Sequence, residues 1–210
     1  MVVIGHSMGG LLAKSLVCDS GDNLWDAVFT VRPERLVVSK DALNDLRGSF
    51  FFKARKDVAK VIFMATPQRG SYLAANWLGR LGSRLVHLGG DWSAENRQIA
   101  REQKAFIRPQ MSRYFARGGS SSIDSLSPKH PLLAAFENLV PEPRIPCYLI
   151  IGSVTRTLTG VISDGVVTFD SANLQYAKQT LILPGAGHGG VTNDSRAIAW
   201  IIDLLKHRLP

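Results

Sequence analysis

Cysteine is scarce in this chain: Cys18 and Cys147 are the only two among 210 residues. Two cysteines do not make the disulfide framework of a small secreted domain, so we expect both to be small buried apolar side chains. The histidines and cysteines also lack the spacing of metal ligands. The sequence therefore predicts no metal site, and no cofactor is called for.

Long apolar runs are missing as well. No stretch approaches the length that a membrane span needs, and the mean hydropathy is close to zero. The first apolar run is only Val2-Val3-Ile4 and leads straight into Gly5, which is unlike a secretory leader. We expect a soluble or peripheral protein, with the cytoplasm as the default compartment.

Acidic residues are outnumbered, 17 against 25 lysines and arginines, which gives a net charge of +8. Such a balance can indicate a nucleic-acid or membrane partner. Here the bases are dispersed, and no RNA-binding or helix-turn-helix signature accompanies them. The densest patch, from Lys53 to Lys60, includes Asp57. A solvated basic surface is the expectation, with no nucleic-acid partner.

Four short apolar runs are present, at 2–4, 61–64, 147–151 and 180–183. None alternates apolar with polar residues, which is typical of parallel strands covered by helices on both faces. Helical spacing of apolar residues predicts helices between them, including 9–18 and a last helix over 194–208. The pattern predicts one α/β domain, 1–210, with a parallel sheet of about four strands.

The span 71–141 is too long for an ordinary connection between two strands. It predicts a helical cap or lid inserted into the domain, with helices over 71–86, 94–115 (interrupted by Pro109) and 131–139. Gly118 to Ser122 predicts a flexible joint. One predicted helix carries a basic stripe, for which a solvated face is favoured over a membrane-docking face: Arg97, Arg101, Lys104 and Arg108.

The most specific motif is Gly5-His6-Ser7-Met8-Gly9, which lies between the first predicted strand and the first predicted helix. A G-x-S-x-G sequence in that context predicts a nucleophile elbow, where a sharp turn exposes the serine. The glycines two before and two after Ser7 would relieve crowding. The helix that begins at Met8 would direct its N-terminus at developing negative charge.

A serine hydroxyl is a poor nucleophile until a base takes its proton, and the base needs an acid that orients it. His188 follows the last predicted strand, where a base can reach the serine; His6 is expected to pack beneath the elbow. The carboxylates between the third strand and His188 are Asp164, in a tight Asp-Gly turn, and Asp170. Asp164 is favoured, and Asp170 stays open as a surface or capping residue.

The glycines around His188 also spell G-x-G-x-x-G, from Gly185 to Gly190. A dinucleotide site needs a further strand and an acidic residue about 20 positions later. The sequence ends at Pro210, so the interpretation as a dinucleotide site is rejected.

Three segments in this order resemble the α/β-hydrolase esterase/lipase superfamily, and most of all its lipase-like and GPI-inositol-deacylase-like members: 5–10, Ala65-Thr66-Pro67-Gln68-Arg69-Gly70-Ser71 and Ser163-Asp164-Gly165-Val166-Val167. Residues 122–128 are similar to part of their cap. The resemblance implies a triad of Ser7, Asp164 and His188, with the Met8 N–H as one oxyanion donor. Where family members commonly have histidine in the second segment, this chain has Gln68.

The resemblance implies a serine hydrolase that cleaves carboxylic esters, including lipid esters, through an acyl-enzyme. An acyltransferase would use the same triad. The competing class is a weak or inactive fragment, or an interaction module, because the family's earlier strands have no counterpart before the elbow. The loop with the second oxyanion donor lies among them. We therefore expect weak ester hydrolysis or none, and self-association through the exposed edge of the first strand.

Overall fold

The structure is a computed structural model that describes residues 1–73, 97–118, 125–156 and 160–206. The predicted helix over 71–86 and the predicted joint lie almost wholly outside these residues, as do His87 and His207. The chain divides into two compact units. The sheet unit comprises 1–19, 53–74 and 140–210, and the helical unit comprises 20–52 and 75–139.

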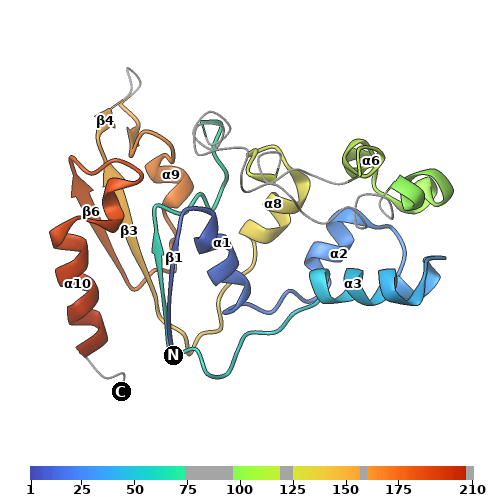
Figure 1. Cartoon of the computed structure of the whole chain (residues 1–210), viewed down its shortest axis with the longest axis horizontal. Helices are drawn as coiled ribbons and strands as arrows, with labels where there is room; N and C mark the ends of the chain where they lie inside the picture. The colour runs from blue at the N-terminus through green and yellow to red at the C-terminus, as the bar shows by residue number, and fades with distance from the viewer. Residues whose placement is uncertain (74–96, 119–124, 157–159, 207–210) are drawn as a thin grey trace. The chain divides into compact units, whose positions relative to one another are not determined.

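The sheet unit contains four parallel strands in the order β1-β2-β3-β6 (Figure 1). Their bounds are Val2–His6, Lys60–Met64, Cys147–Ser153 and Gln179–Pro184. All five residues of β2 are buried, as the absence of alternation predicted. The predicted parallel sheet of about four strands is confirmed.

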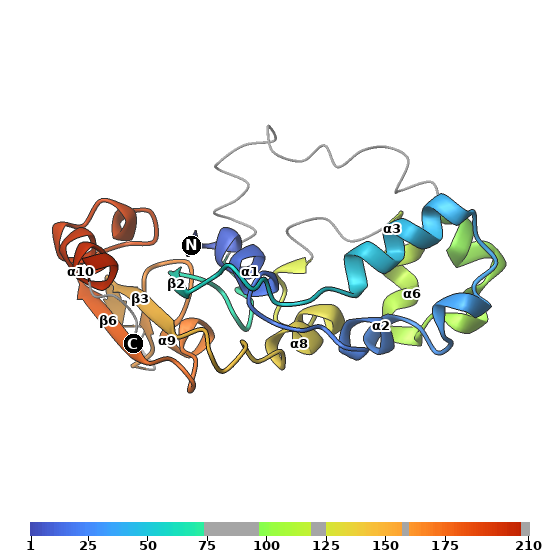
Figure 2. The ribbon, with the colours of Figure 1, turned by 90° about the horizontal axis from the view of Figure 1, so that it is seen from below.

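Two helices cover the sheet. Helix α1 (Met8–Ser15) follows β1 directly, and α10 (Ser195–Lys206) follows β6, so both predicted helices are present. The apolar face of α10 packs with alternate residues of β2 and β3, among them Ile62, Tyr148 and Ile150. Figure 2 shows α10 on one side of the strands and α1 on the other. No helix in the described part of the chain is long and apolar enough to cross a membrane.

Shorter elements complete the sheet unit. A small antiparallel pair, β4 (Thr155–Arg156) and β5 (Ile162–Ser163), follows β3. Helix α9 (Phe169–Ala172) comes next, and the 3-10 turn η3 (Gly190–Thr192) precedes α10. These elements follow the carboxyl ends of β3 and β6, which is the edge where parallel α/β sheets gather their functional loops.

The outer strand β1 pairs with β2 alone in the described part of the chain. The Ile4 side chain on this strand is 44% exposed. A neighbouring basic patch differs from its prediction: Lys53 is exposed and paired with Asp19, but Lys60 is buried. The Lys60 ammonium donates to the Leu204 carbonyl, so a structural hydrogen bond offsets its desolvation.

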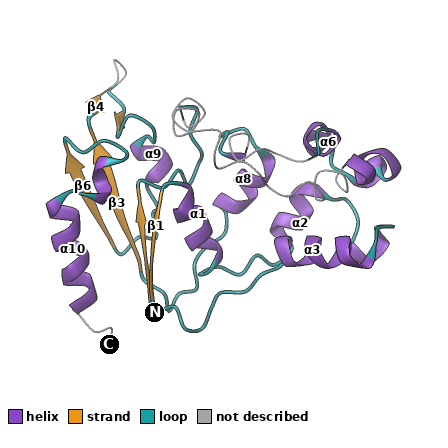
Figure 3. Cartoon of the chain, in the orientation of Figure 1, coloured by secondary structure: helices purple, strands orange, loops and turns teal. Residues whose placement is uncertain are grey.

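The helical unit contains helices and turns but no named strand in its described residues (Figure 3). Residues 20–52, for which no elements were predicted, supply α2 (Asn23–Val28), η1 (Pro33–Arg35) and α3 (Lys40–Phe50). The described parts of 75–139 supply η2 (Lys104–Phe106), α6 (Pro109–Ala116) and α8 (Pro131–Glu137). Their shared core is centred on Trp25 and Phe29.

The helix predicted over 94–115 is interrupted at Pro109, as expected, but the interruption is wider than the sequence indicated. Residues 97–102 are helical, but the chain extends at Ile107, which forms a bridge with Phe29, and α6 begins only at Pro109. Proline disfavours helical backbone in the residue before it, and Arg108 is accordingly extended, with ψ of 138°. The basic stripe is therefore divided among separate elements. The Arg108 guanidinium donates to the Asp26 carbonyl, which is a structural contact.

Candidate active site

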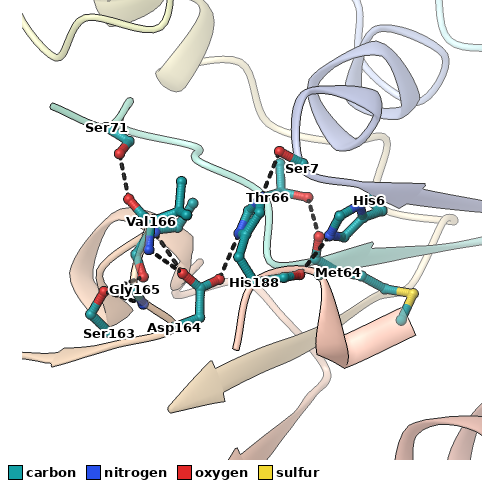
Figure 4. Close-up of polar contacts among 12 residues, drawn as sticks. His6, Ser7, Met64, Thr66, Ser71, Ser163, Asp164, Gly165, Val166 and His188 are labelled. Carbon is teal, nitrogen blue, oxygen red and sulfur yellow. Dashed lines mark hydrogen bonds and ion pairs between the residues drawn. The ribbon is translucent and has the colours of Figure 1, made fainter. Parts of the chain in front are cut away.

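Ser7 lies in the sharp turn between β1 and α1 (Figure 4). Its φ of 53° falls in the left-handed region, which non-glycine residues rarely occupy. The Ser7 N–H donates to the Met64 carbonyl at 2.9 Å, so the end of β2 holds the turn in this conformation. Strain of this kind is characteristic of functional turns and exposes the serine hydroxyl at the strand end.

Glycine is needed at two positions of the elbow because neighbouring atoms approach its backbone closely. A Cβ on Gly5 would lie 2.5 Å from the Gly10 Cα, and one on Gly10 would lie 1.9 Å from the Thr66 Oγ1. A Cβ on Gly9 would meet no atom of the described residues within 4 Å. The expectation that glycine relieves crowding is therefore confirmed for Gly5 and wrong for Gly9, and Gly10 is the second position where glycine is needed.

The His188 imidazole lies between Ser7 and Asp164 (Figure 4). Its Nε2 is 2.9 Å from the Ser7 Oγ, and its Nδ1 is 2.8 Å from the Asp164 Oδ2. The side chains of His188 and Asp164 are almost fully buried, at 2% and 1% exposure. Because a carboxylate only accepts, Nδ1 carries a proton and Nε2 of the neutral ring can accept the Ser7 proton.

The Asp164 carboxylate is fixed by the turn that contains it. Its Oδ1 accepts from the N–H groups of Val166 and Val167 at 2.8 and 2.7 Å, while Oδ2 faces His188. Gly165 has a φ of 92°, which explains the Asp-Gly sequence of the turn. Asp170 instead lies in the first turn of α9, and its backbone carbonyl accepts from Arg69.

The loop that follows β2 braces this turn, a contribution that the sequence did not reveal. The Ser71 hydroxyl donates to the Val166 carbonyl, and the Arg69 guanidinium donates to the Asn173 carbonyl at 2.8 Å. Gln68, whose role was left open, is fully buried. Neither polar atom of its side-chain amide has a hydrogen-bond partner among the described residues.

His6 contacts the site from the other side of Ser7. Its Nε2 is 2.9 Å from the His188 carbonyl oxygen, and the two rings lie 5.0 Å apart. Burial lowers the pKa of His6 below its ordinary value. The prediction that His6 packs near the elbow did not anticipate this hydrogen bond, because it joins residues 182 positions apart.

The backbone of α1 adds positive potential at Ser7. Met8 is the first residue of this eight-residue helix, so its N–H has no acceptor within the helix. The helix dipole adds partial positive charge at the same end. Among the described residues, no group of three or more His, Cys, Asp or Glu side chains is arranged to hold a metal ion.

The structure thus brings Ser7, His188 and Asp164 into one hydrogen-bonded series, with Met8 and His6 on either side of the serine in sequence. A hydroxyl, a base and a buried carboxylate in series are the parts that nucleophilic acyl transfer needs. The arrangement is therefore a candidate active site.

No family model matches the chain, and neither does the sequence of any curated protein. Solved structures that resemble it include lipase 1 from Pelosinus fermentans, with 13% identity and a TM-score of 0.49 over 100% of this chain and 72% of that one. Another is mature lipase BlEst2 of Bacillus licheniformis, with 15% identity and a TM-score of 0.48 over 98% of this chain. The chain spans 65% of the BlEst2 structure.

Proposed function

We propose that this chain carries the catalytic centre of a serine hydrolase that cleaves carboxylic esters through an acyl-enzyme. The observation that carries the proposal is the continuous series from the Ser7 Oγ through the His188 imidazole to the Asp164 carboxylate. The left-handed backbone of Ser7 supports it independently, because strain is retained where function requires it. The proposed roles are nucleophile, general base and orienting acid.

In the acylation half, the Ser7 Oγ attacks the ester carbonyl carbon while the His188 Nε2 takes the hydroxyl proton. The carbonyl π electrons move onto oxygen, and the Met8 N–H donates to that oxyanion. The intermediate collapses by breaking its bond to the alcohol oxygen. The departing alcohol takes the proton from the His188 Nε2, which leaves acylated Ser7 and a neutral imidazole.

In deacylation, water is the nucleophile and the Ser7 oxygen is the leaving group. The His188 Nε2 removes a proton from water as its oxygen attacks the acyl carbon, and the second intermediate releases the Ser7 oxygen, which regains its proton from His188. The carboxylic acid leaves. Asp164 stays ionised throughout and stabilises the imidazolium by charge and by the bond to Nδ1.

The elbow itself supplies one oxyanion donor, the Met8 N–H. Loss of a single donor typically reduces turnover by ~10²–10³. Where the Met8 N–H acts as the single donor, we expect slow ester turnover, while Ser7 still reacts with an activated electrophile. On the sequence motifs, we place the chain among lipase-like hydrolases, close to the GPI-inositol-deacylase-like members, with a lipid-like ester as substrate and 71–141 as the cap.

The test is to react the purified chain with a fluorophosphonate probe and map the modified residue by mass spectrometry, alongside p-nitrophenyl butyrate hydrolysis. Ser7→Ala should abolish labelling. Ser15→Ala should not, because the Ser15 hydroxyl only donates to the Leu12 carbonyl within α1. A folded wild-type chain that is never labelled at Ser7 would contradict the proposal.

The two assays also separate the other functions compatible with the sequence. Labelling at Ser7 without ester turnover indicates an inactive or weak hydrolase. Ester consumption that accelerates on addition of an alcohol and yields a new ester indicates acyl transfer. No labelling and no turnover indicates an interaction module.

A further inference from the structure

The two neighbouring residues His6 and Ser7 contact the same residue at two different points. Ser7 meets the His188 ring at Nε2, at 2.9 Å, and the His6 Nε2 meets the His188 backbone carbonyl oxygen, also at 2.9 Å. Asp164 contacts His188 twice as well, through Nδ1 and through the backbone N–H at 3.0 Å. The hydrogen bond from His6 thus adds to the contacts that locate this residue, and Figure 4 shows it beside the contact with Ser7.

The chemistry of the partner determines the proton on His6. A backbone carbonyl only accepts hydrogen bonds, so the His6 Nε2 must be the donor, and the neutral ring has its lone pair on Nδ1. The hydrogen bond fixes the His6 tautomer. It also occupies the His188 carbonyl, which lies in the loop between β6 and α10.

We propose that His6 is a positioning residue: it donates to the His188 carbonyl and so holds the His188 imidazole at hydrogen-bonding distance from Ser7. This inference rests on the proposed function, because it assigns His6 a part in the same reaction. Both contacts come from the carboxyl end of β1. His6 is its last residue, in register with Met64, and Ser7 is tied to the same Met64 by its N–H. One strand end thereby sets the position of nucleophile and base together.

The neutrality of His6 matters as much as its hydrogen bond. The His6 and His188 rings are 5.0 Å apart, so a cationic His6 would oppose the positive charge that His188 acquires in each half-reaction. Burial of His6 lowers its pKa, and the charged groups that face it are His188 and Asp164. Histidine can donate here while remaining uncharged at neutral pH, whereas lysine or arginine could not.

The simplest competing explanation is that His6 only fills space beneath the elbow. Three variants separate the explanations. His6→Ala removes the donor and the volume, His6→Gln keeps a neutral N–H donor of similar reach, and His6→Asn keeps the donor group but shortens it by one methylene. Positioning predicts that Gln rescues and that Asn loses as much as Ala, whereas space filling predicts losses graded by the volume removed, with Asn between Gln and Ala.

The experiment measures the second-order rate of fluorophosphonate labelling of Ser7 against pH for the intact chain and each variant. We expect about a tenfold loss for His6→Ala and His6→Asn, and a rate within about threefold of wild type for His6→Gln. The control is His130→Gln, which changes a buried histidine of the helical unit. It should leave the rate unchanged. Equal rates for wild type and His6→Ala would overturn the inference.

A second readout does not depend on reactivity. The proton shared by the His188 Nδ1 and Asp164 should give a downfield imidazole signal in the ¹H NMR spectrum, assigned by its loss in His188→Gln. We expect this signal to be lost or strongly shifted in His6→Ala and restored in His6→Gln. If wild type shows the signal but no labelling, the proposed function fails while the positioning is still decided by this signal. An unchanged signal in His6→Ala overturns the positioning.

Discussion

The two units of this chain pack their interiors in different ways. The sheet unit brings backbone against backbone: a Cβ on Gly5 would meet the Gly10 Cα at 2.5 Å, and one on Gly152 would meet the Ala186 carbonyl oxygen at 2.4 Å. The helical unit packs aromatic rings. Trp25 lies 4.4 Å from Phe29 and is stacked on Phe51 at 5.5 Å.

The difference explains where the candidate site lies. Close backbone approach leaves few alternative positions for a turn, so Ser7, His188 and Asp164 can be held to within hydrogen-bonding distances. Aromatic packing instead buries large side chains and supports helices that are individually short. Each unit should therefore respond to a different kind of substitution.

The largest effect is expected for Trp25→Ala. Trp25 is fully buried, and its indole N–H donates to the Val31 carbonyl at 2.7 Å. Removing it should cost about 3–5 kcal/mol of unfolding free energy. Trp200→Ala in the sheet unit should cost less, because Trp200 is only partly buried. Urea unfolding followed by circular dichroism measures both, and equal losses would contradict the contrast.

Gly5→Ala tests the backbone contact of the sheet unit. The added methyl group should cost about 1–3 kcal/mol and slow the labelling of Ser7, because the clash is with backbone and cannot be relieved by a side-chain rotation. Its matched control is Gly9→Ala, which lies within α1 and whose added methyl group would meet no atom of the described residues within 4 Å. There alanine should stabilise the helix by up to about 1 kcal/mol. The two variants should differ in sign in urea unfolding.

A smaller effect concerns the outer strand of the sheet unit. The half-exposed Ile4 on β1 leads us to propose that the chain self-associates through this edge at micromolar concentrations. Ile4→Lys should shift the chain toward monomer in sedimentation velocity. Val37→Lys, at an exposed apolar residue of the helical unit, should not. Identical behaviour of wild type and Ile4→Lys would contradict association through β1.

The smallest effect is expected for the rate at which the two thiols of the sheet unit react. Burial raises the pKa of Cys18 and of Cys147 to about 12, so both stay protonated at pH 8 and should react slowly with a disulfide reagent. Raising the pH toward 12 should speed the reaction. Because both cysteines lie in the sheet unit, they should stay protected in Trp25→Ala if the helical unit opens alone. Rapid reaction of native wild type at pH 8 would contradict the shifts.

How far the sequence predicts the structure also differs between the units. Four uninterrupted apolar runs identified the four parallel strands to within two residues. The expected burial on both faces holds for the inner strands β2 and β3, whereas the outer strands β1 and β6 are partly exposed. Residues 20–52 of the helical unit were not predicted. Helix α3 does carry a signal, since Ser39 accepts from the Ala42 N–H as an N-cap and Ala42 and Leu46 are buried on one face. The short α2 has too few residues to show a period.

By itself the sequence identified the four apolar runs that form the parallel strands, the candidate nucleophile and base, and two candidate acids in the loop after the third run. Three features were decided only by the tertiary structure: the choice between Asp164 and Asp170 beside His188, the sites where glycine is needed, and the hydrogen bond from His6 to the His188 carbonyl. Each depends on contacts between residues far apart in the chain. Local propensity and periodicity carry no record of such contacts, which form only when the sheet brings its strand ends to one edge.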